Sequence, residues 1–204
     1  MRIVSGNFRG KKIDQAKGKN TRPLKDLTKE SIFNILQHNK LIKIKIEESK
    51  ILDLFSGVGS FGFECISRGA KYVIFCENYT QTLKVLKKNI NEFDCVDKTQ
   101  VVKENIFQIN HLKNITKNKF EIIFLDPPYK EKKLNYLLNE IINLKILKSA
   151  GIIIIHRHKK EKDNFPYPFK IIEEKKYGIS KIIFGFFYWI KIFFVSFLIS
   201  STAG

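Results

Sequence analysis

From residue 50 onward, short runs of apolar residues alternate with segments of helical periodicity. Each apolar run is nearly continuous, which is typical of strands that helices cover on both faces of a sheet. Alternation of strands and helices favours parallel pairing, because each crossover helix returns the chain to the same edge. The sequence therefore predicts an α/β fold with a mostly parallel, Rossmann-like sheet. The expected strands are 50–56, 72–77, 100–105, 120–126 and 151–158, and the expected helices are 59–69, 80–93 and 134–147.

Residues 168–187 break this alternation, because two apolar segments follow each other around a turn at Tyr177–Gly178. We expect an antiparallel hairpin here, which completes a seven-stranded sheet. The tail, residues 188–204, is apolar and carries one charge, Lys191. A membrane-spanning helix needs about 20 apolar residues, and the tail supplies fewer once the hairpin is formed. We expect the tail to pack on the domain or to be poorly ordered, rather than to cross a membrane.

The N-terminal part of the chain precedes the alternating pattern. Residues 1–14 are interrupted by glycines and predict a small β-hairpin. A helical pattern follows a polar loop, and Asp26 or Thr28 is its expected N-cap. We therefore expect residues 1–48 to be an extension of the same domain, and residues 49–187 to be its main body.

The chain is strongly basic, with a formal net charge of +17 over 204 residues. Such a charge indicates a polyanionic partner. Part of it reflects a general bias of the composition toward Lys, Ile, Asn and Phe. Nucleic acid is favoured over a membrane surface, because basic residues gather near the N-terminus; a solvated basic face without an RNA role is the alternative. The candidate phosphate contacts are Arg2, Arg9, Lys11, Lys12 and Arg22.

The three cysteines, Cys65, Cys76 and Cys95, show neither a CxxC motif nor paired spacing. This usage is typical of buried thiols in a reducing compartment. The first residues lack the apolar stretch of a secretory signal. We therefore expect a cytoplasmic protein, and we expect it to be a monomer.

A glycine motif, G-x-G-x-x-G, follows the first strand of the alternating region at Gly57, Gly59 and Gly62. Glycines at these positions let a ligand approach the backbone, and the next helix begins there. Glu77 ends the next strand, 20 residues after Gly57, where its carboxylate can accept both hydroxyls of a ribose. The motif predicts a nucleoside cofactor; a tight turn without a ligand is the alternative.

Asp53 lies four residues before Gly57 and places a carboxylate beside the glycine turn. A carboxylate there disfavours the pyrophosphate of a nicotinamide cofactor. It favours S-adenosylmethionine, which carries a sulfonium and an ammonium group. A second role is open for Asp53, namely binding the backbone N–H groups of the loop. Asn105, after the third strand, is a candidate for reading the adenine edge, with an exposed loop residue as the alternative.

The segment Asp126–Tyr129 reads "DPPY" and follows a buried strand. The carboxyl ends of parallel strands share one edge, so this segment and the glycine motif are expected to line one crevice. The Asp126 carboxylate and the Pro127 carbonyl, stiffened by Pro128, are suitable acceptors for an exocyclic amine. Tyr129 offers a face on which a flipped base can stack. Asp126 positions the amine, and whether it also takes the proton is open.

Several motifs together resemble the RsmD family of 16S ribosomal RNA guanine-N2 methyltransferases, over residues 1 to about 187. The resemblance implies a class I fold, S-adenosylmethionine as cofactor, and transfer of its methyl group to one guanine of small-subunit ribosomal RNA. It implies that the partner is 16S rRNA within an assembling or assembled subunit. The motifs are "MRIVSG…RG", "TRPLKDLTKESIFNIL", "LDLFSGVGSFGFECISRGA", "FLDPPY" and "YGISKI".

The chain departs from the family pattern in two places. Leu24 and Thr28 stand where polar and basic residues are expected, which weakens the assignment of RNA contacts in that loop. His156 and His158 end the fifth strand, where the family commonly has an acidic residue. A metal pair is one reading, but no Cys or carboxylate cluster accompanies them. We expect solvated histidines near RNA phosphate and no metal site.

Three other functions fit parts of the same pattern. A DNA adenine or cytosine amino-methyltransferase would use the same crevice, but such enzymes usually carry a larger target-recognition region. A non-catalytic RNA-binding assembly factor would not need a nearly complete crevice. A nicotinamide-dependent oxidoreductase is disfavoured by Asp53 and the "DPPY" segment together.

Overall fold

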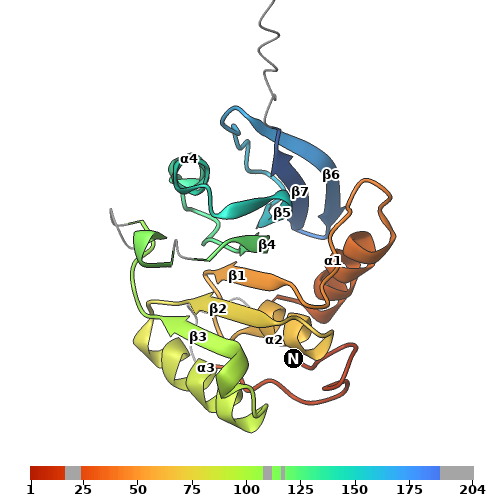
Figure 1. The fold of residues 1–204 in the computed structure, drawn as a ribbon, viewed down its shortest axis with the longest axis vertical. Coiled ribbons are helices and arrows are strands. Elements are labelled where there is room, and N and C mark those ends of the chain that lie inside the picture. The colour runs from red at the N-terminus through yellow and green to blue at the C-terminus, as the bar shows by residue number, and fades with distance from the viewer. Residues whose placement is uncertain (17–23, 108–111, 116–117, 189–204) are drawn as a thin grey trace, which may run out of the picture.

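The computed structural model describes residues 1–16, 24–107, 112–115 and 118–188 (Figure 1). The strands are β1 (Lys50–Leu54), β2 (Tyr72–Cys76), β3 (Thr99–Val102), β4 (Phe120–Leu125), β5 (Leu147–His158), β6 (Phe169–Tyr177) and β7 (Ser180–Phe187). They form one sheet in the order β3-β2-β1-β4-β5-β7-β6. Neighbours from β3 to β5 are parallel, whereas β7 is antiparallel to β5 and β6. The predicted sheet with its terminal hairpin is confirmed.

Helices cover both faces of the sheet, and Figure 1 shows α1 and α4 on opposite sides of it. Helices α1 (Asp26–His38), α2 (Ser60–Ser67) and α3 (Thr80–Glu92) pack on one face. Helix α4 (Leu134–Leu144) packs on the other face with the 3-10 helix η2 (Leu112–Ile115). Alternate strand residues enter the two cores, so Ile51 faces α2 and its neighbour Leu52 faces α4.

Stacked phenylalanine rings fix the start of α2 against the sheet. The ring of Phe61 lies 4.1 Å from that of Phe124 on β4 and 5.4 Å from that of Phe33 on α1. All three side chains are buried. Burying a ring of this size stabilises the fold by about 1.5–3 kcal/mol. The helix that follows the glycine motif is therefore anchored to both of its neighbours.

Some element boundaries differ from those expected. The helix expected over residues 134–147 ends at Leu144, because Lys145 takes a left-handed conformation with φ +51° and redirects the chain. Strand β5 then begins at Leu147 instead of residue 151. Strand β3 ends at Val102, so the last residues of the strand expected over 100–105 lie in a loop.

The prediction that Asp26 or Thr28 is the N-cap of α1 is wrong. Lys25 occupies the cap position, and no side chain there bonds to the first turn. Asp26 lies inside the first turn, where its charge is favourable toward the helix dipole. Thr28 is a buried residue of the helix.

The predicted N-terminal hairpin forms a single β-bridge, between Arg2 and Lys12, and no strand. The reason is that the backbone N–H groups of Val4 and Ser5 donate to the carboxylate of Glu64 on α2, at 2.8 and 3.0 Å. These groups are therefore not available to a partner strand. The segment instead runs beside α2 (Figure 1) and contributes Ile3 and Ile13 to the same core.

Other expectations concern the whole chain. The three cysteines are free and buried, as predicted. Within the described residues, no helix is both long enough and apolar enough to cross a membrane. The prediction for the tail falls on residues 189–204, which lie outside the described part, as does Arg22.

Candidate active site

A cavity of about 660 Å³ opens at the carboxyl ends of β1, β2 and β4. Strand order reverses between β1 and β4, and open α/β sheets bind ligands at such a point. The cavity collects the predicted catalytic and cofactor-binding residues, with the exception of Gly59, which precedes α2 without lining the cavity. The predicted residues that line it are Asp53, Gly57, Glu77, Asn105, Asp126, Pro127 and Tyr129.

The glycine loop wraps one end of the cavity. Gly57 and Gly59 adopt positive φ angles of +57° and +88°. A Cβ at Gly62 would lie 2.2 Å from the ring of Phe75, so this glycine lets α2 pack against β2. The loop is also held by Glu77, whose two oxygens accept the N–H of Gly57 at 2.9 Å and that of Tyr79 at 2.7 Å.

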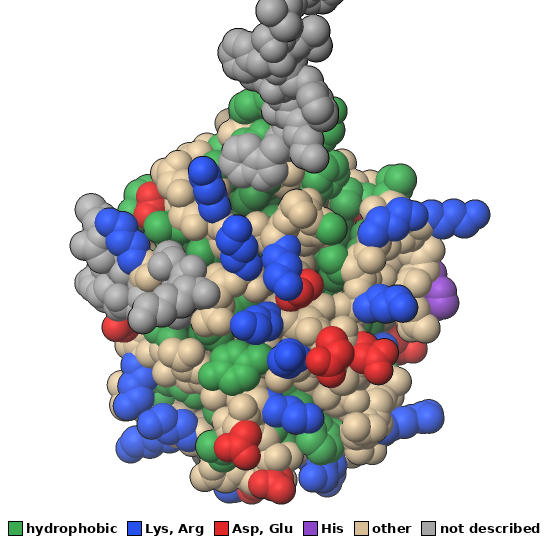
Figure 2. All heavy atoms as spheres, viewed as in Figure 1, with side chains coloured by type: hydrophobic (Ala, Val, Ile, Leu, Met, Phe, Trp, Pro, Cys, Tyr) green, Lys and Arg blue, Asp and Glu red, His purple; other side chains and the backbone are tan. Residues whose placement is uncertain are grey.

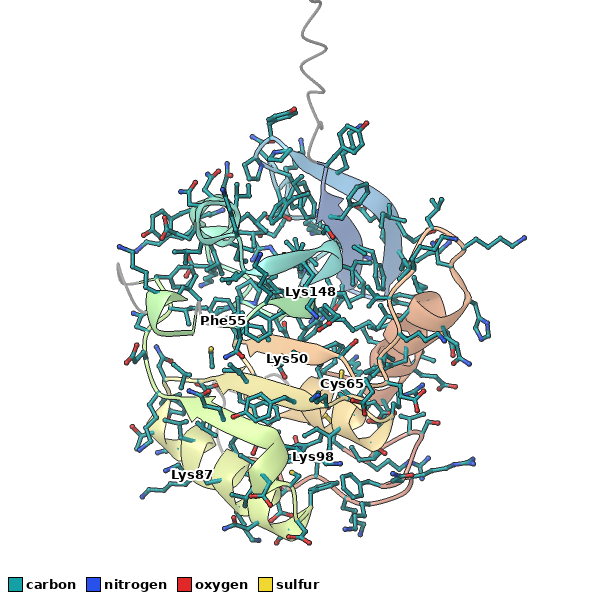
Figure 3. The ribbon with its side chains drawn as sticks, in the orientation of Figure 1. Lys50, Phe55, Cys65, Lys87, Lys98 and Lys148 are labelled. Carbon is teal, nitrogen blue, oxygen red and sulfur yellow. The ribbon has the colours of Figure 1, made fainter. Side chains whose placement is uncertain are left out.

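Phe55 precedes the glycine loop in a left-handed conformation, with φ +66°. A non-glycine residue in this region carries about 1–2 kcal/mol of strain. Its ring lies 5.4 Å from that of Phe107, and both residues line the cavity. Figure 3 labels Phe55 at the carboxyl end of β1 and Lys50 at its amino end. The strain is therefore located at the mouth of the cavity.

Replacing Gly57 with alanine is expected to weaken binding of S-adenosylhomocysteine at least about 10-fold, because the new methyl group would project beside the ligand. Gly178 is a matched control. Both glycines have nearly the same φ, +57° and +55°, and a Cβ at either would meet nothing within 4 Å. Both variants should lose about 1 kcal/mol of stability. Titration calorimetry and thermal unfolding measure the two effects; equal affinity in both variants would exclude a ligand at this loop.

Asp53 is buried beneath the loop, with 1% of its surface exposed. Its Oδ2 accepts the N–H of Gly62 at 3.1 Å, which is the second of the two roles expected for it. Its Oδ1 is buried and has no hydrogen-bond partner among the described residues. Burial raises the pKa of Asp53 well above 3.8, and the charges of Asp126 and Glu77 raise it further, against the hydrogen bond from Gly62. Such a carboxylate is suited to a cationic partner.

Asp126 also lines the cavity, just beyond the end of β4. Its backbone N–H donates to Leu54 at 3.3 Å and so extends the β1–β4 pairing by one residue. Its Oδ1 lies 2.8 Å from Nδ1 of His156 on β5. His156 is only 3% exposed, so the expectation of a solvated histidine is wrong for this residue. It is buried because β5 is paired on both edges, with β4 and with β7.

The "DPPY" loop is supported from below by the buried side chain of Arg157, which is 1% exposed. Its guanidinium donates to the carbonyl of Pro128 at 3.3 Å and to that of Glu131 at 3.0 Å. Its Nε donates to Asp163 at 3.1 Å. A planar, always charged guanidinium is well suited to holding several acceptors at once. The loop is therefore fixed at its backbone.

Tyr129 is half-buried at the edge of the cavity. Its hydroxyl lies 2.7 Å from Oγ of Ser180 on β7. The edge of one ring meets the face of the other between Tyr129 and His158, with centroids 4.9 Å apart. These contacts hold the tyrosine ring in place. Asn105 is exposed, and its Oδ1 accepts the N–H of Phe107 at 3.1 Å, so part of its side chain orders the loop.

Comparison with known proteins places the chain in a family. A family model described as "Conserved hypothetical protein 95" matches residues 1–186. The chain belongs to this family. The curated relatives of this RsmD-family protein include Ribosomal RNA small subunit methyltransferase D of Buchnera aphidicola subsp. Acyrthosiphon pisum. The two are 32% identical over 173 residues, which are 85% of this chain and 86% of the relative.

Two further relatives come from Haemophilus influenzae. Its Ribosomal RNA small subunit methyltransferase D is 30% identical over 181 residues, which cover 88% of this RsmD-family chain and 90% of the relative. A crystal structure described as a candidate methylase has a TM-score of 0.68 and 27% identity, and covers 90% of this chain and 96% of that one. The resemblance seen in the sequence motifs is confirmed.

The candidate phosphate contacts of this RsmD-family protein that the structure describes lie on its N-terminal segment. Arg2, Arg9, Lys11 and Lys12 are all exposed. Lys11 also lies over the rings of Phe8 and Phe93, at 5.0 and 5.4 Å from the centroids. Figure 2 shows lysine and arginine side chains spread over the whole face in view, with acidic side chains between them. The same segment reaches the cavity, since Met1, Gln15 and Ala16 line it.

Sequence reasoning missed two contacts that shape this RsmD-family site. One is the hydrogen bond between His156 and Asp126, and the other is the support of the loop by Arg157. The only signal in the sequence was that His156 and Arg157 directly follow an unbroken apolar run in a central strand. No group of three or more His, Cys, Asp or Glu side chains in the described part is placed to hold a metal ion.

Proposed function

We propose that the protein transfers a methyl group from S-adenosylmethionine to the N2 amine of one guanine in small-subunit (16S) ribosomal RNA. One observation carries this proposal. A single cavity joins a glycine loop and a buried, half-satisfied carboxylate to the Asp126–Tyr129 segment. The relatives named as small-subunit methyltransferases support ribosomal RNA as the substrate class.

The cavity fits S-adenosylmethionine, because the unpartnered Oδ1 of Asp53 can accept the ammonium group of its methionine part. We assign Gly57 and Gly59 to the backbone turn that the cofactor approaches. Glu77 would bind the ribose hydroxyls while it holds the loop, and Asn105 would contact the adenine. The cofactor supplies a methyl group that is bonded to a cationic sulfur. The neutral thioether that remains after the transfer is a good leaving group.

Guanine N2 is a poor nucleophile because its lone pair is delocalised into the ring. We infer that Asp126 and the Pro127 carbonyl accept hydrogen bonds from its two N–H groups, which favours a pyramidal nitrogen. Tyr129 would stack on the flipped base. Held by Asp53 and the glycine loop, the cofactor would supply the methyl group to N2, and its sulfur would keep the electron pair of the broken carbon–sulfur bond. The proton then leaves N2 for Asp126 or for water.

We propose that residues 1–48 contact the RNA backbone, and that the main domain, residues 49–187, carries out the transfer as a cytoplasmic monomer. Replacing both Arg2 and Arg9 with alanine should weaken RNA binding and reduce the slope of log affinity against log salt by about 1 per lost phosphate contact. Fluorescence anisotropy at several salt concentrations measures this. Lys98→Ala is the control, because Lys98 precedes the amino end of β3, away from the cavity (Figure 3). An unchanged slope in the arginine variant would show that the N-terminal segment is not part of the RNA interface.

One assay tests the proposed function against its rivals. The protein is incubated with methyl-labelled S-adenosylmethionine and either small ribosomal subunits or duplex DNA. The expected result is label on N2 of guanine in 16S rRNA, found by nuclease digestion and mass spectrometry. Label on DNA would show a DNA amino-methyltransferase. No label on any nucleic acid, including naked rRNA, would leave a binding protein without this activity. Light scattering during gel filtration tests the monomer.

A further inference from the structure

We propose that His156 is a positioning residue for methyl transfer: it holds the catalytic carboxylate of Asp126 in the orientation that the amine requires. The two side chains meet at 2.8 Å, between Nδ1 of His156 and Oδ1 of Asp126. This inference depends on the proposed function, because it concerns the same cavity. It adds a residue to which the sequence motifs assign no role and which does not line the cavity.

The strand register brings this pair together. Leu125 on β4 pairs with Ile155 on β5, so the next residues along the two parallel strands, Asp126 and His156, stand side by side. Across β5, His156 pairs with Ile182 of β7. The histidine backbone is therefore held in the sheet by β7, and its neighbour Ile155 is held by β4. Asp126, by contrast, has left the strand and enters a loop that begins with two prolines.

The direction of the hydrogen bond follows from the chemistry of the two groups. A carboxylate has no proton to give, so Nδ1 of His156 must carry the hydrogen and donate it to Oδ1. Directed in this way, the bond fixes the rotation of the carboxylate about its terminal torsion, which is otherwise broad. An acceptor for an amine proton is effective only in one narrow geometry. His156 thus supplies the orientation, while Asp126 makes the contact.

The last residues of β5 support the neighbouring parts of the same loop. Arg157 holds the carbonyls of Pro128 and Glu131, and His158 lies against the ring of Tyr129. Three successive side chains of one rigid strand thus contact the carboxylate, the backbone and the aromatic ring of the "DPPY" segment. Of these contacts, only that of His156 reaches the group assigned to the reacting amine.

Two substitutions of nearly equal shape test the role of His156. Asparagine places an amide N–H close to the position of Nδ1, whereas leucine has the same branching and no donor. His156→Asn should keep kcat within about threefold of the wild type. His156→Leu should lower kcat about 10–100-fold, the range expected when a hydrogen bond to a charged group is lost. KM for the ribosomal subunit and for S-adenosylmethionine should change little in both variants, because His156 touches neither.

A double variant separates positioning from a merely structural effect. If His156 acts through Asp126, adding His156→Leu to Asp126→Ala should cause no further loss of kcat. A leucine variant with wild-type kcat would overturn the proposal, and so would a full additional loss in the Asp126→Ala background. An inactive wild type would instead contradict the proposed function. Should the leucine variant not fold, ¹⁵N NMR of the wild-type histidines decides, since Nδ1 of His156 must be protonated; an unprotonated Nδ1 overturns the proposal.

Discussion

Replacing Asp126 with alanine is expected to lower kcat for methyl transfer by about 10²–10⁴-fold, the usual effect of losing a positioned acceptor or base. Asp126 lines the cavity at the carboxyl end of β4 and is held there by His156. Without it, the amine has lost its charged acceptor and the lone pair is no longer directed toward the methyl group. Single-turnover transfer of labelled methyl to small subunits measures the loss.

Binding of S-adenosylhomocysteine should survive in this variant within about threefold, because the lost contact belongs to the target base. Asp126→Asn divides positioning from proton removal, since an amide keeps one oxygen acceptor but is not a base. Retention of more than about a tenth of the wild-type rate would assign Asp126 to positioning. Asp97→Ala, at an exposed carboxylate on η1 (Val96–Lys98), is the control. Wild-type activity in Asp126→Ala would contradict the assignment of the cavity.

The sheet and the position of the site follow from local patterns and one topological rule. Unbroken apolar runs such as 120–126 identify buried parallel strands, because only such strands are covered on both faces. The motifs at Gly57 and Asp126 are 69 positions apart in the chain, yet both follow strands of the same direction. Their meeting in one cavity is therefore predictable. Their hydrogen bonds are not, since they depend on side chains of other elements.

The hydrophobic pattern of the sequence does not predict which polar side chains are buried. His156 and Arg157 look like the solvated end of a strand, and only the pairing of β7 beside them shows that they are enclosed. Lys29 and Glu64 likewise resemble surface residues of helices, but both are fully buried, with Lys29 Nζ 3.5 Å from the Glu64 carboxylate. Burial lowers the pKa of Lys29, and the two nearby carboxylates oppose this shift.

The shortness of the antiparallel pairing at the N-terminus has the same origin. Residues 1–14 have the composition of a hairpin, and an isolated hairpin would satisfy its own backbone groups. In the protein, Glu64 accepts two of these groups, and the N–H of Phe8 donates to Ser67 Oγ at 2.9 Å. Glu64 and Ser67 are three residues apart on α2 and so lie on one face of that helix. The conformation of residues 1–14 therefore depends on contacts with α2, which cannot be predicted from the sequence of residues 1–14 alone.

Asp53→Asn is expected to stabilise the protein while it weakens cofactor binding. The Asn side chain can accept the N–H of Gly62 as Asp53 does. It removes a buried charge whose Oδ1 is unpartnered, so the free energy of unfolding near neutral pH should rise by about 1–3 kcal/mol. Affinity for S-adenosylmethionine should fall about 100-fold, because the ammonium group loses its charged partner. Thermal unfolding and titration calorimetry measure the two changes.

The stability gain should depend on pH in a defined direction. Burial raises the pKa of Asp53 in the folded protein well above 3.8, so the folded state binds the proton more tightly than the unfolded state. The contribution of Asp53 to the free energy of unfolding therefore decreases as pH rises above 3.8 toward the folded pKa, and the Asn variant lacks this decrease. The difference in melting temperature between variant and wild type should therefore grow as pH rises above about 4 and through the raised pKa of Asp53.

Cofactor binding responds to the same proton with the opposite consequence. Only the deprotonated Asp53 attracts an ammonium group, so wild-type affinity for S-adenosylmethionine should increase as pH rises through the raised pKa. In Asp53→Asn this increase should be absent. Asp97→Asn, the same substitution at an exposed position, should change neither property. If Asp53→Asn binds S-adenosylmethionine with wild-type affinity, the buried carboxylate does not bind the cofactor. Its role would then be limited to holding the glycine loop.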